Sequence, residues 1–417
     1  MIVKHTLSNG LRIVAEPIPH VRSVALGIWI GTGSENETKE ENGISHFIEH
    51  MMFKGTKKRT ARQIAEAFDE IGGHVNAFTS KEMTCYYAKV LDQHFSVALD
   101  ILGDMFFESV FSEEEMEKEK KVVIEEIRMV EDTPDDLVHD LLSEVSMGNH
   151  TLSYPVLGTV ENVMSFTRDD LFRYKERFYH PQNVVIAIAG NLPQDYLEQV
   201  EAVFAKHQGK PASIQKKPPV FTPHVKTRVK ATEQTHLCIG LPGLSMRDER
   251  IYTLVLLNNV LGGNMSSRLF QEIREERGLA YSVYSYHSAH RDSGLFAIYA
   301  GTAHGQEDEV CELIKQVLHQ ISEKGITPKE LSKAKEQLKA SIMLGLESTN
   351  NRMSRLGRNE LLLDRHFTLD EIIQSVENIS LDDVNQLARE MFSSKMSLAL
   401  ISPTGEVPAS FRGKAVV

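Results

Sequence analysis

Residues 43–50, GISHFIEH, place two histidines and a glutamate within two turns of a predicted helix. Successive residues on a helix are about 100° apart, so His46, Glu49 and His50 project from the same side. Neutral imidazoles bind zinc, and a carboxylate beside them can remove a proton from a water that the metal acidifies. The segment therefore predicts a metal site with an adjacent base. The motif alone also fits a surface helix with two solvated histidines.

A catalytic zinc needs a third protein ligand, and a second helix can supply it. We expect that helix over residues 112–130, because Ser112 followed three residues later by Glu115 is a capping-box pattern. Within it, Glu119 and Glu126 are two turns apart and share a face. The spacing alone also fits two solvated glutamates.

Together these motifs resemble the pitrilysin/insulinase family of zinc peptidases, in which the His-x-x-Glu-His order defines the inverzincins. The resemblance is closest to the mitochondrial-processing-peptidase-like branch, in the two-domain form of the bacterial subunits. It includes the matching stretches 51–56 (MMFKGT), 76–80 (NAFTS) and 267–282 (SRLFQEIREERGLAYS), and it covers essentially the whole chain. It implies a hydrolase, more narrowly a metalloprotease with one zinc ion per chain.

The resemblance also implies roles for the five residues of the two helices. It assigns His46, His50 and Glu126 as zinc ligands and Glu49 as the general base. Glu119 matches a second acidic position, where it is expected to orient a ligand or tune the metal from outside its coordination sphere.

Peptide binding is expected at an edge strand that contains Asn76 and Ala77. In the family, substrate joins this strand through main-chain hydrogen bonds, which leaves binding largely independent of substrate sequence. Phe53, Phe78 and Phe270 are the expected walls of an apolar side-chain pocket. Ordinary core packing is the alternative for each of the three phenylalanines.

Two further pairs match family positions that contact substrate. Arg274 and Tyr281 match an arginine and a tyrosine that stabilise the negative charge of the transition state. Asp136 and Asp140 match acidic positions that receive basic side chains, which suggests a preference for arginine or lysine near the cleavage site. The alternatives are a surface ion pair and half-buried tyrosine for the first pair, and a solvated helix face for the second.

Composition and charge exclude several classes of protein. The 417 residues are 41% hydrophobic and 25% charged, and the net charge of −12 argues against nucleic acid as a partner. No apolar run approaches about 18 residues, so we expect no membrane span. The amino terminus reads as a strand entering an Asn-Gly hairpin and not as an apolar signal segment, which predicts a cytoplasmic protein. The three cysteines are expected to be buried free thiols: Cys85, Cys238 and Cys311.

The two halves of the chain read as distant copies of one unit. Residues 112–127 align with residues 327–342, and each segment starts at a hydroxyl cap. In this alignment the two acidic positions of the first copy correspond to Ala334 and Ser341. The second copy therefore has no carboxylates for a metal, and only the first half is expected to be hydrolytic.

The fold class predicted from these copies is α+β, with two homologous domains. Each domain is expected to have a mainly antiparallel sheet with helices packed on one face, as in processing-peptidase-like metallohydrolases. Strands are predicted, for example, over residues 24–29 and 295–300. The predicted division is a catalytic domain over 1–206, a proline-bearing linker over 207–224, and a domain without metal that supplies substrate contacts over 225–417.

Assembly follows from the resemblance as well. Larger family members join four such units around a closed chamber, so this chain is expected to form a homodimer that takes unfolded or short peptides. Arg274 and Tyr281 would then act on the zinc of the partner subunit. Two alternatives remain open: a non-catalytic scaffold subunit of the respiratory-complex core type, and a metal-dependent hydrolase of small non-peptide amides.

Overall fold

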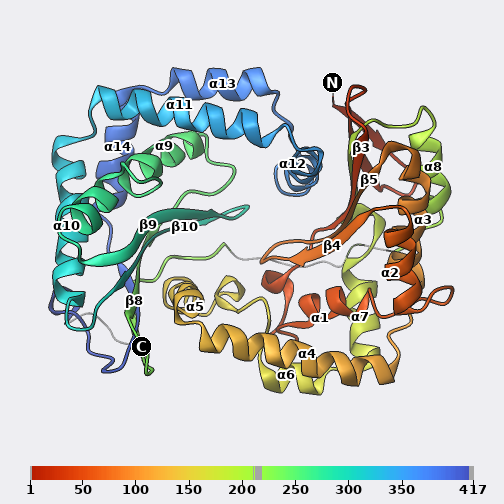
Figure 1. The fold of residues 1–417 in the computed structure, drawn as a ribbon, viewed down its shortest axis with the longest axis horizontal. Helices are drawn as coiled ribbons and strands as arrows, with labels where there is room; N and C mark the ends of the chain where they lie inside the picture. Colours follow the sequence, from red (N-terminus) through yellow and green to blue (C-terminus); the bar gives the residue numbers. More distant parts are fainter. Residues whose placement is uncertain (1, 210, 212–217, 413–417) are drawn as a thin grey trace. The chain divides into compact units, whose positions relative to one another are not determined.

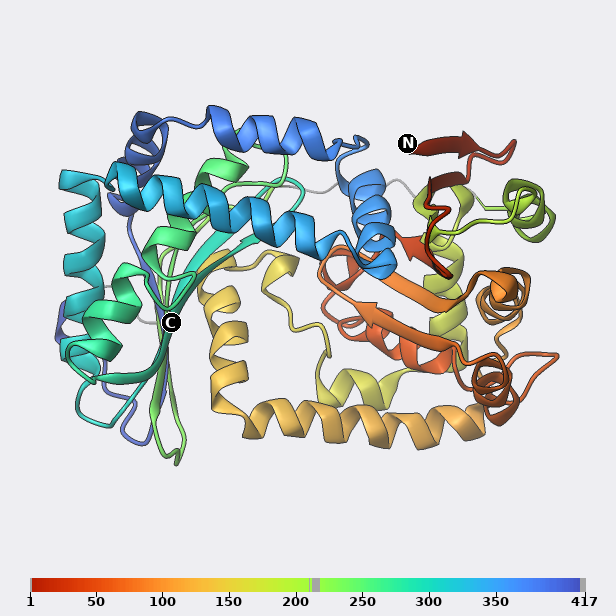
Figure 2. The ribbon, with the colours of Figure 1, turned by 45° about the horizontal axis from the view of Figure 1, so that its top comes forward.

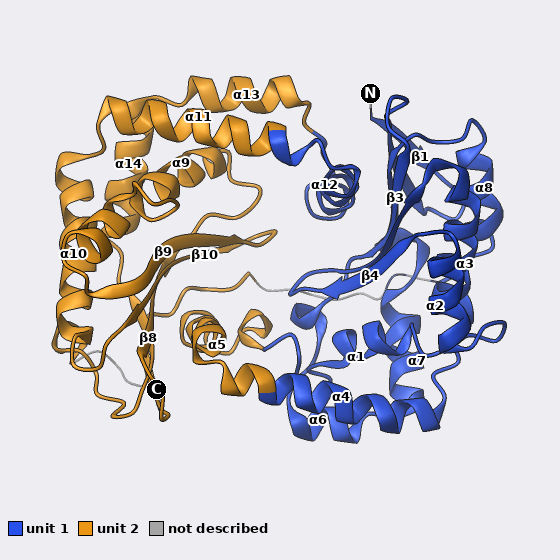
Figure 3. Ribbon diagram, in the orientation of Figure 1, with its two compact units in different colours: residues 1–128, 155–216, 344–366 blue, residues 129–154, 217–343, 367–417 orange. Residues whose placement is uncertain are grey.

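The computed structural model describes residues 2–209, 211 and 218–412 and divides the chain into two compact units (Figure 3). Unit 1 comprises residues 1–128, 155–216 and 344–366, and unit 2 comprises the rest. Part of the predicted linker, residues 210 and 212–217, lies outside the described residues. In the described ranges, no helix is long and apolar enough to cross a membrane.

Unit 1 has a six-stranded sheet in the order β1-β2-β6-β3-β5-β4. Three neighbouring strands of this sheet, β3, β5 and β4, can be followed in Figure 1. All neighbouring strands are antiparallel except β2 and β6. Its strands are β1 (Val3–Thr6), β2 (Arg12–Pro17), β3 (Ser23–Ile30), β4 (His74–Thr79), β5 (Thr84–Leu91) and β6 (Val184–Gly190). Its main helices are α1 (Ile44–Met51), α2 (Ala61–Glu70), α3 (Phe95–Glu108), α6 (Val160–Ser165), α7 (Arg168–Phe178), α8 (Tyr196–Phe204) and α12 (Thr349–Leu362), with α4 (Glu113–Asp132) starting in unit 1 and ending in unit 2.

Unit 2 has a five-stranded sheet in the order β7-β11-β8-β10-β9. Its strands are β7 (Val225–Val229), β8 (Thr235–Pro242), β9 (Ala280–Ala289), β10 (Gly294–Thr302) and β11 (Ser397–Ser402). Its helices are α5 (Pro134–Met147), α9 (Ile251–Leu261), the π-helix η5 (Phe270–Glu275), α10 (Glu307–Lys324), α11 (Pro328–Gly345, whose last residues lie in unit 1), α13 (Leu369–Asn378) and α14 (Leu381–Phe392).

The two sheets share one topology. The order β2-β6-β3-β5-β4 in unit 1 corresponds to β7-β11-β8-β10-β9 in unit 2. In each order the first pair is parallel, β2 with β6 and β7 with β11, and every other pair is antiparallel. The long helices α4 and α11 also occupy corresponding places in the order of elements along the chain, as the second α-helix after β5 and β10, respectively. This confirms the internal repeat and the α+β fold class.

Local sequence signals explain several element boundaries. The Ser112 hydroxyl accepts from the amide of Glu115 at the start of α4, as the capping-box pattern predicts. Thr167 and Ser380 cap α7 and α14 in the same way. The three cysteines are free and buried, as expected.

Each sheet is covered on both faces, and the helix on the second face comes from the other half of the sequence. In unit 1, α12 packs on β2, β3 and β6 (Figures 1 and 2). At this contact the indole of Trp29 donates to the Met353 sulfur over 3.2 Å. In unit 2, α5 packs on the sheet through Leu141 and Leu142. Helices therefore lie on both faces of each sheet and not on one face as predicted, because α12 and α5 cover the second faces. The predicted contiguous ranges 1–206 and 225–417 do not include this exchange of segments.

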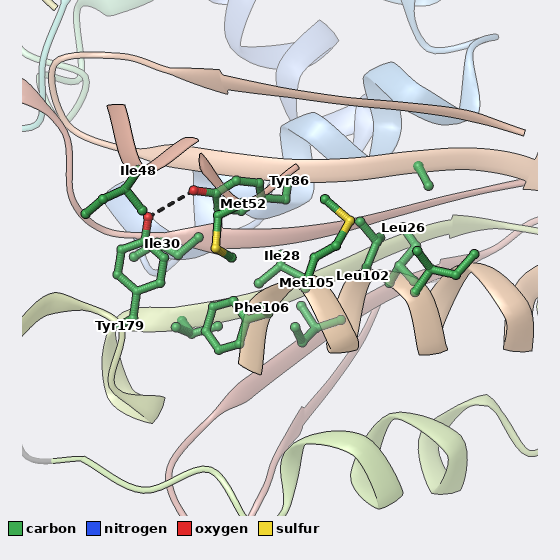
Figure 4. Close-up of a cluster of buried hydrophobic side chains, with 14 of the residues drawn as sticks. Leu26, Ile28, Ile30, Ile48, Met52, Tyr86, Leu102, Met105, Phe106 and Tyr179 are labelled. Atoms are coloured by element: carbon green, nitrogen blue, oxygen red, sulfur yellow. Dashed lines mark hydrogen bonds between the residues drawn. The ribbon is translucent and has the colours of Figure 1, made fainter. Parts of the chain in front are cut away.

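The core of unit 1 holds the predicted metal-binding helix in place. Two side chains from this region, Ile48 of α1 and Met52 just after the end of α1, pack in a buried cluster with β3, β5 and α3 (Figure 4). In the same cluster the phenol groups of Tyr86 and Tyr179 lie 3.1 Å apart, within hydrogen-bond distance. One face of α1 is therefore fixed by packing while the other carries the polar residues.

Candidate metal centre

The amino end of α1 is fixed by a buried carboxylate. Glu37 accepts hydrogen bonds from the amides of Gly43 (2.8 Å) and Ser45 (2.9 Å), which have no partner inside the helix. Gly43 has a φ of 100°, and a Cβ there would lie 2.8 Å from the Cα of Gly158. Only glycine fits this turn, so the sequence before His46 sets where the helix starts.

Three ligand atoms converge in unit 1. His46 Nε2 and His50 Nε2 lie 3.2 Å apart, and each is 3.6 Å from Glu126 Oε2. A tetrahedral zinc with bonds of about 2.0–2.1 Å separates its ligand atoms by about 3.3–3.4 Å. The triangle therefore fits a zinc ion bound by two imidazoles and one carboxylate. It is the one such group of histidine, cysteine and acidic side chains found among the described residues.

Glu119 lies behind His50. Its Oε1 is 2.8 Å from His50 Nδ1, and its Oε2 is 2.6 Å from Lys54 Nζ. The hydrogen bond fixes the proton of His50 on Nδ1 and leaves the Nε2 lone pair for a metal. Burial opposes ionisation of Glu119, but the bonds from His50 and Lys54 outweigh it and lower the pKa of this carboxyl.

The two histidines differ in their environment. Burial, reinforced by the charge of His50, lowers the pKa of His46 to about 3, so this imidazole is neutral near pH 7. Burial also disfavours charge on His50, but the hydrogen bond to Glu119 and the neighbouring carboxylates outweigh it and raise its pKa. A divalent cation here would replace the proton that those carboxylates attract.

Glu49 lies on the same helix face but stands apart from the ligand triangle. Its Oε2 accepts a 2.6 Å hydrogen bond from the Thr79 hydroxyl. Burial raises the pKa of Glu49, and the bond from Thr79 acts in the opposite direction. A raised pKa suits a carboxylate that takes up a proton and gives it back near neutral pH.

Strand β4 is a free edge of the sheet in unit 1 and carries Asn76 and Ala77. The amide of Ala77 donates to the side chain of Asn76 over 2.8 Å. The amide of Ser80 donates to Met83 at the turn into β5, and amides alternate in direction along a strand, so that of Ala77 points away from β5. This donor therefore faces outward, where an added strand would find it.

Phe53 and Phe78 lie on opposite faces of this sheet. Phe53 packs with Tyr86 on the face that α1 covers, with ring centroids 6.5 Å apart. Phe78 contacts Trp29 on the other face, at 5.5 Å. Neighbouring positions of a strand alternate, so Ala77 and Phe78 also point in opposite directions. The structure does not bring Phe53 and Phe78 into one wall.

In unit 2, Arg274 lies between two aromatic rings. Its guanidinium carbon is 4.8 Å from the ring centroid of Phe270 and 5.2 Å from that of Tyr281. Phe270 and Arg274 belong to the π-helix η5, a widened turn that is frequent at functional sites. Tyr281 is 75% exposed at the start of β9. The structure thus groups these three predicted substrate residues, with Phe270 supporting the arginine.

Asp136 and Asp140 lie one turn apart on α5, and their helix also carries a histidine that the motifs did not single out. His139 Nδ1 is 2.6 Å from the Tyr286 hydroxyl and its Nε2 is 3.2 Å from that of Tyr284. Burial lowers the pKa of His139, and the charge of Asp136 opposes this. The acidic pair of the prediction is therefore next to a cluster of aromatic side chains.

Three residues that contribute to the site were missed from the sequence. Lys54, Thr79 and Glu37 bond to Glu119, Glu49 and the start of α1, respectively. Thr79 shares its strand face with Ala77, and this period of two was the available signal. Lys54 and Glu37 carry no signal beyond their closeness to the motif, because their partners depend on tertiary packing.

Comparison with known proteins places this arrangement in a family. The family model described as insulinase (peptidase family M16) matches residues 12–160, and that described as the peptidase M16 inactive domain matches residues 165–338. The chain belongs to the insulinase family, peptidase family M16. The resemblance first seen in the motifs is thereby confirmed. The matched "inactive" model starts after the metal-binding segment, in agreement with a second copy that lacks the carboxylates.

Relatives of similar length extend over nearly all of the chain. A Bacillus subtilis protein named uncharacterized zinc protease YmxG is 56% identical over 409 residues, which cover 98% of this chain and 100% of that one. A Streptomyces coelicolor protein named uncharacterized zinc protease SCO5738 is 43% identical over 414 residues, which cover 97% of this chain and 90% of that one. These names associate zinc and proteolysis with two relatives of this chain.

Solved structures share the fold at low sequence identity. A peptidase M16 inactive domain from Pseudomonas fluorescens superimposes with a TM-score of 0.91 at 21% identity, covering 98% and 99% of the two chains. A protease from Helicobacter pylori gives 0.89 at 22% identity, covering 97% and 99%. A chain of Complex III2 from Candida albicans gives 0.84 at 20% identity, covering 97% and 96%. One fold thus serves a protease and a respiratory complex, so function must be argued from the site.

Proposed function

We propose that the protein is a zinc-dependent endopeptidase that cleaves unfolded or short peptides. The observation that carries the proposal is the triangle of His46, His50 and Glu126 ligand atoms, sized for a tetrahedral ion, with Glu49 on the same helix face. The names of the relatives support it.

His46, His50 and Glu126 would hold the zinc, one ion per chain. When bound, this ion acidifies a water and polarises the scissile carbonyl. Glu49 would take a proton from the attacking water and give it to the leaving amine. Glu119 keeps the His50 imidazole in the required tautomer.

Substrate would bind as an added strand along β4. The outward amide of Ala77 supports this, because an incoming carbonyl can replace the Asn76 side chain as its acceptor. Such pairing needs an extended peptide, so folded proteins should resist cleavage. The exposed ring of Phe78 lies on the face of β4 that points away from α1, where it could contact a substrate side chain.

Arg274 and Tyr281 would complete the site by contacting the bound peptide and the charge of the transition state. We assign them to the zinc of a partner subunit in a homodimer that encloses a chamber. Mixing a His50→Ala variant with an Arg274→Ala variant should then restore activity that neither has alone. No recovery after subunit exchange, with dimer formation verified by light scattering, would count against this assignment.

The decisive experiment is digestion of a peptide mixture read by mass spectrometry. Wild type should cleave peptides, a chelator should abolish cleavage, and added zinc should restore it. Glu49→Gln should bind zinc as wild type does but lose activity by about 10²–10⁴-fold, the usual contribution of a general base. Chelator-resistant cleavage, or full activity of Glu49→Gln, would refute the proposal.

Side-chain preference is the finer part of the proposal. Asp136 and Asp140 would receive an arginine or lysine of the substrate. Matched peptides that differ only in one basic or acidic residue test this, and Asp136→Asn with Asp140→Asn should reduce the preference. Equal turnover of the two peptides by wild type would leave these residues on a solvated helix face.

A scaffold role is the second candidate, because the Candida albicans respiratory-complex chain has the same fold. The triangle of ligand atoms, which is intact in this chain, disfavours it. Purified protein that holds no zinc at equimolar supply would favour the scaffold role instead.

Three buried free thiols fit a reducing compartment, so we propose the cytoplasm as the site of activity.

A further inference from the structure

We propose that Thr79 is the positioning residue for Glu49 and fixes the base relative to the strand that receives the substrate. This inference rests on the proposed function and adds to it a residue with no assigned role. It starts from one contact, the 2.6 Å hydrogen bond from the Thr79 hydroxyl to Glu49 Oε2. In the described part of the chain, no second hydrogen-bond donor reaches this carboxylate.

The contact joins two different parts of the site. Glu49 belongs to α1, with the two histidines, whereas Thr79 is the last residue of β4, with Asn76 and Ala77. Val75, Ala77 and Thr79 share the face of β4 that packs toward the core of unit 1. The main chain of β4 is thus open to a peptide while the side chain at its end holds the base.

Thr79 is itself held rigidly. The next residue, Ser80, accepts from the amide of Ser34 (3.2 Å) and donates its own amide to Met83 (2.8 Å), which closes the turn into β5. Gly33 runs so close to this turn that a Cβ there would lie 2.1 Å from the carbonyl oxygen of Ser80. The end of β4 therefore cannot shift without moving the segment that precedes α1.

The chemistry explains why a threonine serves here. Its hydroxyl occupies one carboxylate oxygen, Oε2, so the other is left to accept the proton of the attacking water. A β-branched side chain has few rotamers, so the hydroxyl stays aimed at Glu49. Displacement of a reacting group by about 1 Å can cost about 100-fold in rate. Holding Glu49 is thus expected to affect turnover more than binding.

Three variants test the inference. Thr79→Val keeps the shape and removes the donor, and Thr79→Ser keeps the donor. Thr84→Val is the comparison variant on the neighbouring strand. The Thr84 hydroxyl lies 3.5 Å from that of Thr79 and donates to the Thr32 carbonyl over 2.9 Å, but it makes no contact with Glu49 in the described structure. Each variant is measured for kcat, KM, zinc affinity by chelator competition, and melting temperature.

We expect Thr79→Val to lower kcat by about 10–100-fold, with KM and the zinc dissociation constant within about threefold of wild type. Thr79→Ser should stay within about fivefold of wild type in kcat, and Thr84→Val within about threefold. A merely structural role would instead move zinc affinity or melting temperature along with kcat.

Two results would overturn the inference while the proposed function stands. In the first, wild type is active and the kcat of Thr79→Val equals or exceeds the kcat of wild type. The other is a loss of kcat in Thr84→Val as large as in Thr79→Val, which would assign the effect to the strand pair and not to the hydroxyl. A wild type that shows no chelator-sensitive cleavage would overturn the proposed function and this inference together.

Discussion

Replacing Glu119 with glutamine should weaken zinc binding without unfolding the protein. Glu119 accepts from His50 Nδ1 over 2.8 Å, and its other oxygen is 2.6 Å from Lys54 Nζ. A hydrogen bond to a charged group contributes about 1.5–3 kcal/mol net. Loss of an outer partner of a metal-bound histidine costs about 10–100-fold in affinity, or about 1.4–2.8 kcal/mol. The two estimates agree, so we expect the zinc dissociation constant to rise about 10–100-fold.

Competition with a chromophoric chelator at neutral pH measures this constant directly. Glu117→Gln is the matched control, since Glu117 lies on the same helix with a side chain 65% exposed and pairs only with Lys120 in the described structure. The control should bind zinc as wild type does. If Glu119→Gln also binds zinc within about twofold of wild type, the carboxylate does not orient His50 and our account of the site is wrong.

Three further predictions concern the scaffold. Burial opposes ionisation of Glu360, but hydrogen bonds from His366 and Lys4 outweigh it and lower its pKa to about 2 from 4.5. Glu360→Gln should therefore destabilise the protein by about 2–3 kcal/mol above pH 4.5 in urea unfolding, and the difference should vanish as the pH falls toward 2; a pH-independent difference would contradict this. Gly357→Ala should lower the melting temperature, at a cost of about 1–3 kcal/mol, because its Cβ would lie 2.3 Å from the Trp29 ring. The three buried thiols should resist a thiol reagent in the native state and all react after denaturation, and fast labelling of the folded protein would refute their burial.

The metal centre was largely predictable because its signals are local. His46, Glu49 and His50 share one helix, and Glu119 and Glu126 share another, so helical periodicity alone orients each set. The prediction that the two helices meet came from the family resemblance. The structure brings them together with the donor spacing that zinc requires.

The exchange of α5 and α12 between the units could not be predicted in this way. An amphipathic helix has one apolar stripe, and the stripe does not specify which sheet it covers. The choice depends on shape, such as Gly357 allowing α12 to lie directly on Trp29. Contiguous domain boundaries are the natural expectation from sequence, and only packing reveals the exchange.

The placement of Phe53 and Phe78 in one pocket overlooked a signal that the sequence did contain. The two residues flank different faces of the sheet, because β4 alternates and Phe78 follows Ala77. The same alternation places Thr79 on the face of Ala77 and toward α1. Applying the period of two to β4 would have placed Phe78 on the face opposite Ala77 and suggested Thr79 as a residue of the site.

The internal repeat indicates the role of the buried carboxylate of Glu119 in unit 1. The position of Glu119 in α4 corresponds to Ala334 in α11, and both are buried, at 4% and 1% exposure. In unit 2 the methyl group of Ala334 simply joins the apolar core. In unit 1 the same helical position holds a carboxylate, which is costly to bury and needs Lys54 and His50 as partners. Since the scaffold folds with alanine there, the carboxylate is retained for the metal-binding histidine and not for stability.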